Sequence, residues 1–385
     1  MPARFNDLFN RLLAEHSVSS SNPAIDKSNL GVINLLADTF ADLGFTCELV
    51  DVPGQHSAPA AHKKANLIAT LGSGPGGLVL SGHTDTVPFD EGLWNFNPLG
   101  MTEKDNRLYG LGATDMKGFF AVVHEAVQDF LDTDLQQPLI ILATADEESS
   151  MEGARTLAAQ GRPKARAAVI GEPTSLRPIH MHKGIMMEGI HVQGRSGHSS
   201  NPALGRNALE AMYDVISALM RFRQQLQMEY RNPHFVIDMP TLNLGVIHGG
   251  DNPNRICGHC TLEFDVRLLP GMASDAIREK IDALITPIAS KHQVEIKLTR
   301  LIPGVEAFDN MDSELGRLAE VLTGHAPESV AFGTEGPFLQ QLGMDTIILG
   351  PGSIDQAHQP NEYMSLDQVK PCIGILQSLI KQYCL

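Results

Sequence analysis

The 385-residue sequence lacks the features of an exported or membrane-bound protein. Its five cysteines are too few and too scattered for a disulfide framework. No apolar run approaches the roughly 18 residues that cross a bilayer. The first 16 residues contain Arg4, Asp7, Arg11 and Glu15 and so lack the continuous apolar core of a secretory signal. We therefore expect a soluble cytoplasmic protein.

Positive charge is also scarce. The 29 Lys and Arg residues against 45 Asp and Glu residues give a formal net charge of -16. Nucleic-acid binding requires clustered Lys and Arg that displace counterions, so we expect no nucleic-acid partner. A cationic small molecule is compatible with this charge.

One cysteine pair has a suggestive spacing. Cys257 and Cys260 form a Cys-x-x-Cys motif, which occurs in zinc and redox sites. No second pair lies at zinc-ribbon spacing, and His259 between them does not complete a site. The pattern favours two thiols in a strand and its approach over a metal or redox centre.

The length predicts two domains, because 385 residues exceed one ordinary hydrophobic core. Strand and helix patterns alternate through residues 1–181, which is typical of an α/β domain with a mainly parallel sheet between helices. Residues 182–292 read instead as a strand-rich α+β insert, and residues 293–385 as the rest of the first domain. Among the connections, we expect a loop over residues 53–64.

Local patterns give approximate element boundaries. We expect helices over residues 30–43, 119–131, 207–227 and 273–291. We expect strands over residues 46–50, 66–71, 78–83, 185–193, 241–247 and 261–268.

The segment 78–88 combines a short apolar strand with His83, Thr84 and Asp85 at its end. In open α/β sheets the ligand crevice lies at the carboxyl ends of the strands, so His83 should face a site. A metal-binding imidazole usually has its second ring nitrogen hydrogen-bonded, and the Asp85 carboxylate is placed to accept that bond. A lone His-x-Asp is more often an ordinary turn, so the motif needs support from elsewhere.

Four further segments supply that support, because each places a possible metal ligand after a strand or at a helix entrance. Asp115 lies in a glycine-rich turn before an apolar helix, and the others follow apolar runs. An isolated Glu-Glu pair would be read as a solvated turn, but the recurrence favours a metal site. The candidates in these segments are Asp115, Glu147, Glu148, Glu172 and His358.

With these motifs, nearly the whole chain resembles the di-zinc aminoacylase/carboxypeptidase-type metallohydrolases. The resemblance implies an α/β catalytic domain with an inserted lid domain that also forms a homodimer. It implies that His83 and Glu172 bind one ion, that Glu148 and His358 bind the other, and that Asp115 bridges them. It also implies that Glu147 is the general base and that Asp85 supports catalysis. Zinc accepts such ligands, but cobalt and manganese also do.

The resemblance also assigns residues outside the metal site. It implies that His198 enters the neighbouring subunit's active site and polarises the scissile carbonyl; without it, His198 would be a surface histidine. Arg255 and Arg267 are candidates for binding a substrate carboxylate, since guanidinium matches its geometry, and Asn254 could join them. They could equally belong to an ordinary hairpin. Glu335 either attracts a substrate ammonium or caps a helix.

The implied activity is hydrolysis of an N-acyl amino acid, preferably N2-acetyl-L-ornithine in arginine biosynthesis. Glu172-Pro173-Thr174 resembles deacetylases and desuccinylases more than dipeptidases. N-succinyl-diaminopimelate desuccinylase is the nearest alternative, followed by a general aminoacylase or dipeptidase. A non-catalytic metal-binding relative is a further alternative, against which Glu147 argues, because a binder needs no base.

Overall fold

In the computed structural model, which describes residues 1–53 and 62–385, the chain divides into two units with separate apolar cores. The first unit contains residues 1–180, 310–328 and 334–385, and the second contains residues 181–309 and 329–333. Most of the loop expected at residues 53–64 lies outside the described residues.

Four parallel strands form the centre of the first unit's sheet, in the order β6-β3-β7-β17. They are β6 (Leu139–Thr144), β3 (Leu78–His83), β7 (Ala167–Ile170) and β17 (Asp345–Ile348). Every residue of β3, β6 and β7 is buried, as expected for parallel strands covered on both faces. Antiparallel strands flank this centre: β2 (Lys64–Leu71) and then β1 (Thr46–Val52) beside β6, and β8 (Ile179–His182) beside β17.

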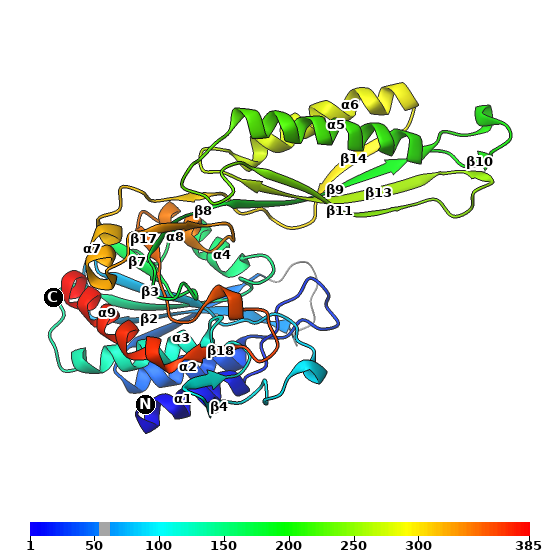
Figure 1. Ribbon diagram of the computed structural model, residues 1–385. Helices are drawn as coiled ribbons and strands as arrows, with labels where there is room; N and C mark the ends of the chain where they lie inside the picture. Colours follow the sequence, from blue (N-terminus) through cyan, green and yellow to red (C-terminus); the bar gives the residue numbers. More distant parts are fainter. Residues whose placement is uncertain (54–61) are drawn as a thin grey trace. The chain divides into compact units, whose positions relative to one another are not determined.

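Helices cover both faces of this sheet (Figure 1). One face carries α3, whose residues are all buried, together with other helices that share its apolar cluster. The opposite face carries α4 and α8. The helices of the first cluster are α1 (Ala3–Ala14), α2 (Leu30–Asp42), α3 (Lys117–Val127), α7 (Glu314–Thr323) and α9 (Leu366–Cys384), and those opposite are α4 (Glu152–Gln160) and α8 (Gly336–Gln341). The mainly parallel α/β fold expected for this part of the chain is confirmed.

A small antiparallel sheet joins two distant parts of the first unit. Its order is β18-β5-β4, and Tyr363 of β18 lies opposite Tyr109 of β5. The strands are β18 (Tyr363–Ser365), β5 (Arg107–Tyr109) and β4 (Thr102–Lys104). The sheet therefore aligns the segment that follows His358 with the segment that precedes Asp115.

The second unit has a four-stranded antiparallel sheet in the order β11-β13-β9-β14, with α5 and α6 along one face (Figure 1). The sheet contains β11 (Thr241–Gly249), β13 (His259–Leu268), β9 (Gly184–Gln193) and β14 (Glu295–Arg300). The helices are α5 (Ala208–Glu229) and α6 (Ser274–His292), and a separate pair is formed by β10 (Gly197–His198) and β12 (Arg255–Ile256). Short elements elsewhere are β15 (Phe308–Asp309), β16 (Glu328–Val330), and 3-10 turns at Glu91–Leu93, Gln128–Phe130, Pro202–Leu204 and Ile354–Gln356.

The boundary near residue 293 differs from the expected one. Strand β14 pairs with β9, where Ile296 lies opposite Val192, and the chain returns to the first unit only at Asn310. The alternating pattern of residues 295–300 predicts a strand but does not specify the sheet that it joins.

Cys260 lies in β13 and Cys257 just before it, both are buried free thiols, and neither belongs to a group of described residues able to hold a metal. The expectation of two thiols in a strand and its approach is confirmed. Within residues 1–53 and 62–385, no helix is long and apolar enough to cross a bilayer.

Candidate metal centre

His83 is the last residue of β3 and is almost completely buried. Its Nδ1 lies 3.0 Å from the backbone carbonyl oxygen of Asp85, so that nitrogen donates, which leaves Nε2 for a partner on the other side of the ring. Nε2 lies 3.1 Å from Oδ1 of Asp115. An imidazole oriented in this way can offer Nε2 to a metal ion.

The Asp85 carboxylate does not make the contact that the sequence suggested. Its Oδ1 is 3.7 Å from Nδ1 of His83, which is too long for a hydrogen bond. Instead it accepts the backbone N–H groups of Glu147, at 3.2 Å, and Glu148, at 3.0 Å. The backbone carbonyl of Asp85 thus orients His83, while its side chain aligns the two glutamates.

The turn after β6 presents Glu147 and Glu148. Asp146 has a left-handed backbone with φ of 59°, and its carbonyl accepts N–H groups from the next turn. Its carboxylate is held by Lys64 Nζ and by the Ser19 hydroxyl, each at 2.9 Å. These bonds fix the turn at the carboxyl end of the sheet.

Asp115 lies between two imidazoles. Its Oδ1 faces Nε2 of His83, and its Oδ2 lies 3.2 Å from Nε2 of His358. The same nitrogen of His358 is 3.1 and 3.0 Å from the two carboxylate oxygens of Glu148. One carboxylate with an imidazole at each oxygen is the arrangement that a bridging ligand requires.

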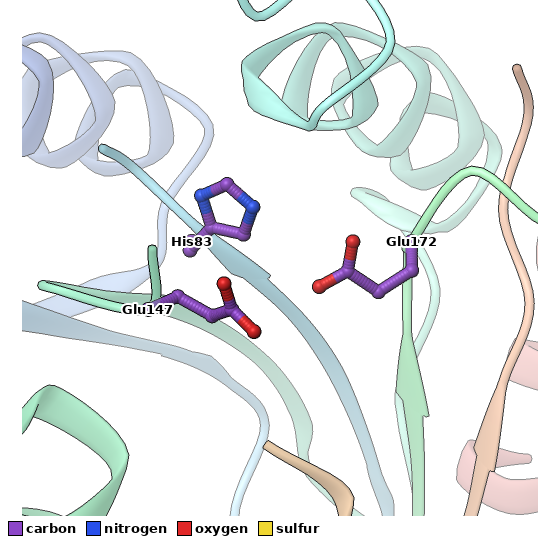
Figure 2. Close-up of side chains that lie close together, drawn as sticks. All are labelled: His83, Glu147 and Glu172. Carbon is purple, nitrogen blue, oxygen red and sulfur yellow. The ribbon is translucent and has the colours of Figure 1, made fainter. Parts of the chain in front are cut away.

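Two groups of side chains can each hold a metal ion among the residues that the structure describes. In each group the possible ligand atoms lie within 4.8 Å of one another. His83, Glu147 and Glu172 form one group, whose side chains converge in Figure 2, and His83, Asp115 and Glu148 form the other. Glu172 follows Gly171, which packs directly against Phe119. A Cβ atom at position 171 would lie 2.3 Å from the Phe119 ring, so this approach requires glycine.

The charges of this site favour a bound cation. Burial, followed by the charge of Glu172, raises the pKa of Glu147 well above its ordinary value. Burial likewise raises the pKa of Glu172 strongly and that of Glu148 to about 6. Hydrogen bonds to Asp115 and Glu148 raise the pKa of His358 to about 10. Crowded buried carboxylates that retain protons are stabilised as anions by divalent ions, so the donor set fits zinc or a similar metal.

Glu335 lies beside this site rather than capping α8. It occupies the N-cap position but makes no side-chain capping bond. Its Oε2 accepts the hydroxyl of Thr144 at 2.9 Å, and its Oε1 is a buried atom with no hydrogen-bond partner among the described residues. Burial raises the pKa of Glu335 to about 7. Of the two alternatives raised by the sequence, helix capping is therefore wrong.

Within the second unit, three of the four candidate residues lie together. His198 of β10 lies opposite Arg255 of β12, and the carbonyl of Asn254 accepts the N–H of Ser199 at 3.1 Å. Nδ1 of His198 lies 2.8 Å from the Ser200 hydroxyl. Arg267 is outside this cluster. It lies near the C-terminal end of β13, where its Nε donates to Asp265 at 3.1 Å. The catalytic and substrate-binding assignments of these residues stay predictions.

Sequence reasoning missed Glu362 and Lys117, two buried charged residues next to the site. The Glu362 carboxyl group accepts backbone N–H groups from the Asp115 turn, and Nζ of Lys117 donates to the carbonyl of Glu15 at 2.9 Å. Burial lowers the pKa of Lys117 to about 8. Their signal was a charged residue within four positions of a candidate ligand, in Asp115-Met116-Lys117 and in His358 to Glu362.

Comparison with known proteins defines the class to which this site belongs. The family model described as Peptidase family M20/M25/M40 matches residues 79–382, and the chain belongs to this family. The chain is similar to acetylornithine deacetylase of Vibrio campbellii, at 47% identity over 384 residues that cover 99% of this chain and 98% of that relative. It is 46% identical over 381 residues to acetylornithine deacetylase of Edwardsiella ictaluri, which covers 99% of this chain and 98% of that relative. The resemblance inferred from the motifs is thereby confirmed.

Solved structures share the fold at low sequence identity. Human carnosine dipeptidase 1 has a TM-score of 0.70 and 19% identity, with 98% of this chain and 95% of that chain covered. An M20 family metallo-carboxypeptidase from Sulfolobus solfataricus has a TM-score of 0.72 and 18% identity, with 99% of each chain covered. A dinuclear metal binding peptidase of the M20 family from Bacillus subtilis has a TM-score of 0.67 and 15% identity, with 98% and 97% covered.

Proposed function

We propose that the chain is a metal-dependent amidohydrolase that converts N2-acetyl-L-ornithine and water to L-ornithine and acetate, in the cytoplasm and for arginine biosynthesis. The observation that carries the proposal is Asp115, whose two oxygens face His83 and His358 within a buried cluster of carboxylates. The similarity to acetylornithine deacetylases over 99% of the chain supports this substrate over other N-acyl amino acids.

The proposed centre holds two divalent ions, preferably zinc. His83 and Glu172 would hold one ion, Glu148 and His358 the other, and Asp115 would bridge them. The N···O contacts between His83, Asp115 and His358 support this assignment, because they gather the donors around one carboxylate. When bound, such ions polarise an amide carbonyl and acidify water.

Glu147 is the proposed general base. Its backbone N–H is fixed by Asp85, and its carboxylate lies with His83 and Glu172. Its raised pKa suits a group that takes a proton from water and later returns it to the departing amine. The same position also allows Glu147 to ligate a metal, so its role requires an experiment that separates metal content from turnover.

The second unit is the proposed lid and homodimerisation domain. We assign His198 to the partner's active site, where its Nε2 would donate to the oxygen that becomes negative in the transition state. The contact of Ser200 with His198 uses Nδ1 and not Nε2, which supports this assignment because Nε2 stays available to donate. Asn254, Arg255 and Arg267 are the proposed partners of the substrate carboxylate, and Glu335 is the proposed acidic group for the ornithine ammonium.

A direct test of specificity is amine release by zinc-loaded protein from three substrates, with and without chelator. N2-acetyl-L-ornithine should be cleaved fastest, ahead of N-succinyl-L,L-diaminopimelate and N-acetyl-L-methionine, and the chelator should abolish the reaction. A preference for the succinylated substrate would identify a desuccinylase instead. Intact substrates together with tightly bound metal would identify a non-catalytic relative.

A further inference from the structure

Glu362 is a buried acidic residue that takes no part in the proposed reaction. It is 1% exposed, and its side chain accepts three backbone N–H groups from one turn. Oε1 accepts those of Thr114, at 2.8 Å, and Asp115, at 3.0 Å, while Oε2 accepts that of Gly112 at 3.1 Å. Its backbone carbonyl also accepts the N–H of Gly110 at 3.1 Å. Four backbone N–H groups of the turn before α3 are therefore bound to this single residue.

The segment that carries Glu362 also carries His358. The N–H of Glu362 donates to the carbonyl of Gln359 at 3.2 Å, which closes a tight turn just after His358. Directly after Glu362, β18 pairs with β5, so this segment is held in register with the chain leading to Asp115. At the other end of the segment, His358 contacts Oδ2 of Asp115 at 3.2 Å.

These contacts form a closed loop of interactions. Asp115 contacts His358 through its side chain and Glu362 through its backbone, and only three residues separate His358 from Glu362. Buried N–H groups that lose their acceptor are costly, so the turn has few other conformations while Glu362 is in place. A substitution of Glu362 should therefore displace Asp115 relative to His358.

We propose that Glu362 is a positioning residue that fixes Asp115 against His358 and thereby sets the affinity for the ion held at Asp115, Glu148 and His358. This inference deepens the proposed function and rests on its assignment of metal ligands. It predicts a larger effect on this ion than on the other, because both ions would share Asp115, whereas His358, four positions before Glu362, would bind this ion alone.

Two variants separate this role from general stability. Glu362→Gln keeps the shape but replaces one acceptor by an N–H₂ donor, and Glu362→Leu removes both acceptors. Gln359→Ala is the matched control, because Gln359 is exposed and its interaction with Glu362 uses only the backbone carbonyl.

The first readout is hydrogen exchange of the peptide covering residues 108–116 in metal-free protein. The second is zinc binding by calorimetry, supported by the absorption spectrum of cobalt-loaded protein.

We expect exchange of residues 108–116 to accelerate in both Glu362 variants, more in Leu than in Gln. One of the two zinc affinities should fall by about 10- to 100-fold, with the other little changed. The control should match wild type. Wild-type exchange rates in the variants, or equal losses of affinity for both zinc ions, would overturn the proposal. If the Leu variant does not fold, the Gln variant decides. If wild-type protein binds fewer than two ions, the proposed function fails, while exchange still reports whether Glu362 holds the turn.

Discussion

The carboxylate of Asp85 accepts the backbone N–H of Glu148 at 3.0 Å. Its other oxygen accepts the N–H of Glu147 at 3.2 Å, while the carbonyl of the same residue receives Nδ1 of His83. One completely buried residue thus couples the end of β3 to the turn after β6. The three side chains that it aligns all belong to the candidate metal groups.

Asp85→Asn should reduce kcat by about 10- to 100-fold and weaken zinc binding. The amide N–H₂ would face the backbone N–H of Glu147 or Glu148, so one of the two bonds is lost. Steady-state kinetics and zinc titration measure these effects, with the exposed Asp132→Asn as the control. Unchanged kcat and zinc affinity would show that the alignment by Asp85 is dispensable.

Glu147→Gln should lower turnover by about 10²- to 10⁴-fold, because the amide cannot accept the proton from water. Zinc content and melting temperature should stay at the wild-type values, since the proposed ligands are retained. Metal analysis and kinetics on the same samples distinguish the roles, with the exposed Glu103→Gln as control. Loss of a zinc ion would instead identify Glu147 as a ligand.

His198→Ala should lower turnover about a hundredfold or more and leave zinc content unchanged, because a donor to the developing oxyanion is lost. The exposed His234→Ala is the matched control in the same unit. Wild-type turnover in His198→Ala would exclude this role.

The assignment of His198 to the partner's site is tested by mixing His198→Ala with Glu147→Gln protein and allowing subunits to exchange. Each mixed dimer would combine one intact Glu147 with one intact His198 at a single site. Up to about a quarter of wild-type activity should return with equal mixing, since about half of the dimers are mixed and each has one working site. A mixture no more active than its components would place His198 in its own subunit's site.

Metal-free protein should lose stability as the pH rises from about 5 to 8. Glu335, Glu147 and Glu172 have raised pKa values in the fold, so the folded state binds more protons than the unfolded state in this range. Their neutral forms are favoured below the folded pKa, and stability declines as they ionise; for Glu335 that pKa is about 7. His83, whose pKa is raised mainly by its bond to Asp115 against the effect of burial, acts in the same direction.

Zinc should reverse this trend, because ionised carboxylates bind the cation more tightly as the pH rises. Calorimetric melting at pH 5 to 8, with chelator and with zinc, measures both curves. A melting temperature of the chelated protein that rises with pH over this range would contradict the account.

The positions of the candidate metal ligands could be predicted because parallel strands place polar residues at one edge of a sheet. His83 ends a buried strand, and Glu148 and Glu172 follow two others. The structure brings them together with Asp115 and His358. Hydrophobic runs of four to six residues were enough to locate these strand ends.

Other features depend on contacts that sequence spacing does not contain. His83-Thr84-Asp85 is compatible with a bond from either the backbone or the side chain of Asp85, and only the turn geometry selects the backbone. Glu362 acts on a turn nearly 250 residues earlier in the chain, so its partners could not be inferred locally. Strand β14 similarly matches either sheet by pattern, and its pairing with β9 decides the matter.

Hydrolysis of N2-acetyl-L-ornithine by chelator-treated protein, followed as zinc is added back in known equivalents, tests the central claim most directly. We predict no measurable hydrolysis without metal, and recovery that is complete at two equivalents of zinc per chain. Undiminished hydrolysis by metal-free protein would contradict it, as would a zinc-saturated protein that leaves acetylornithine intact.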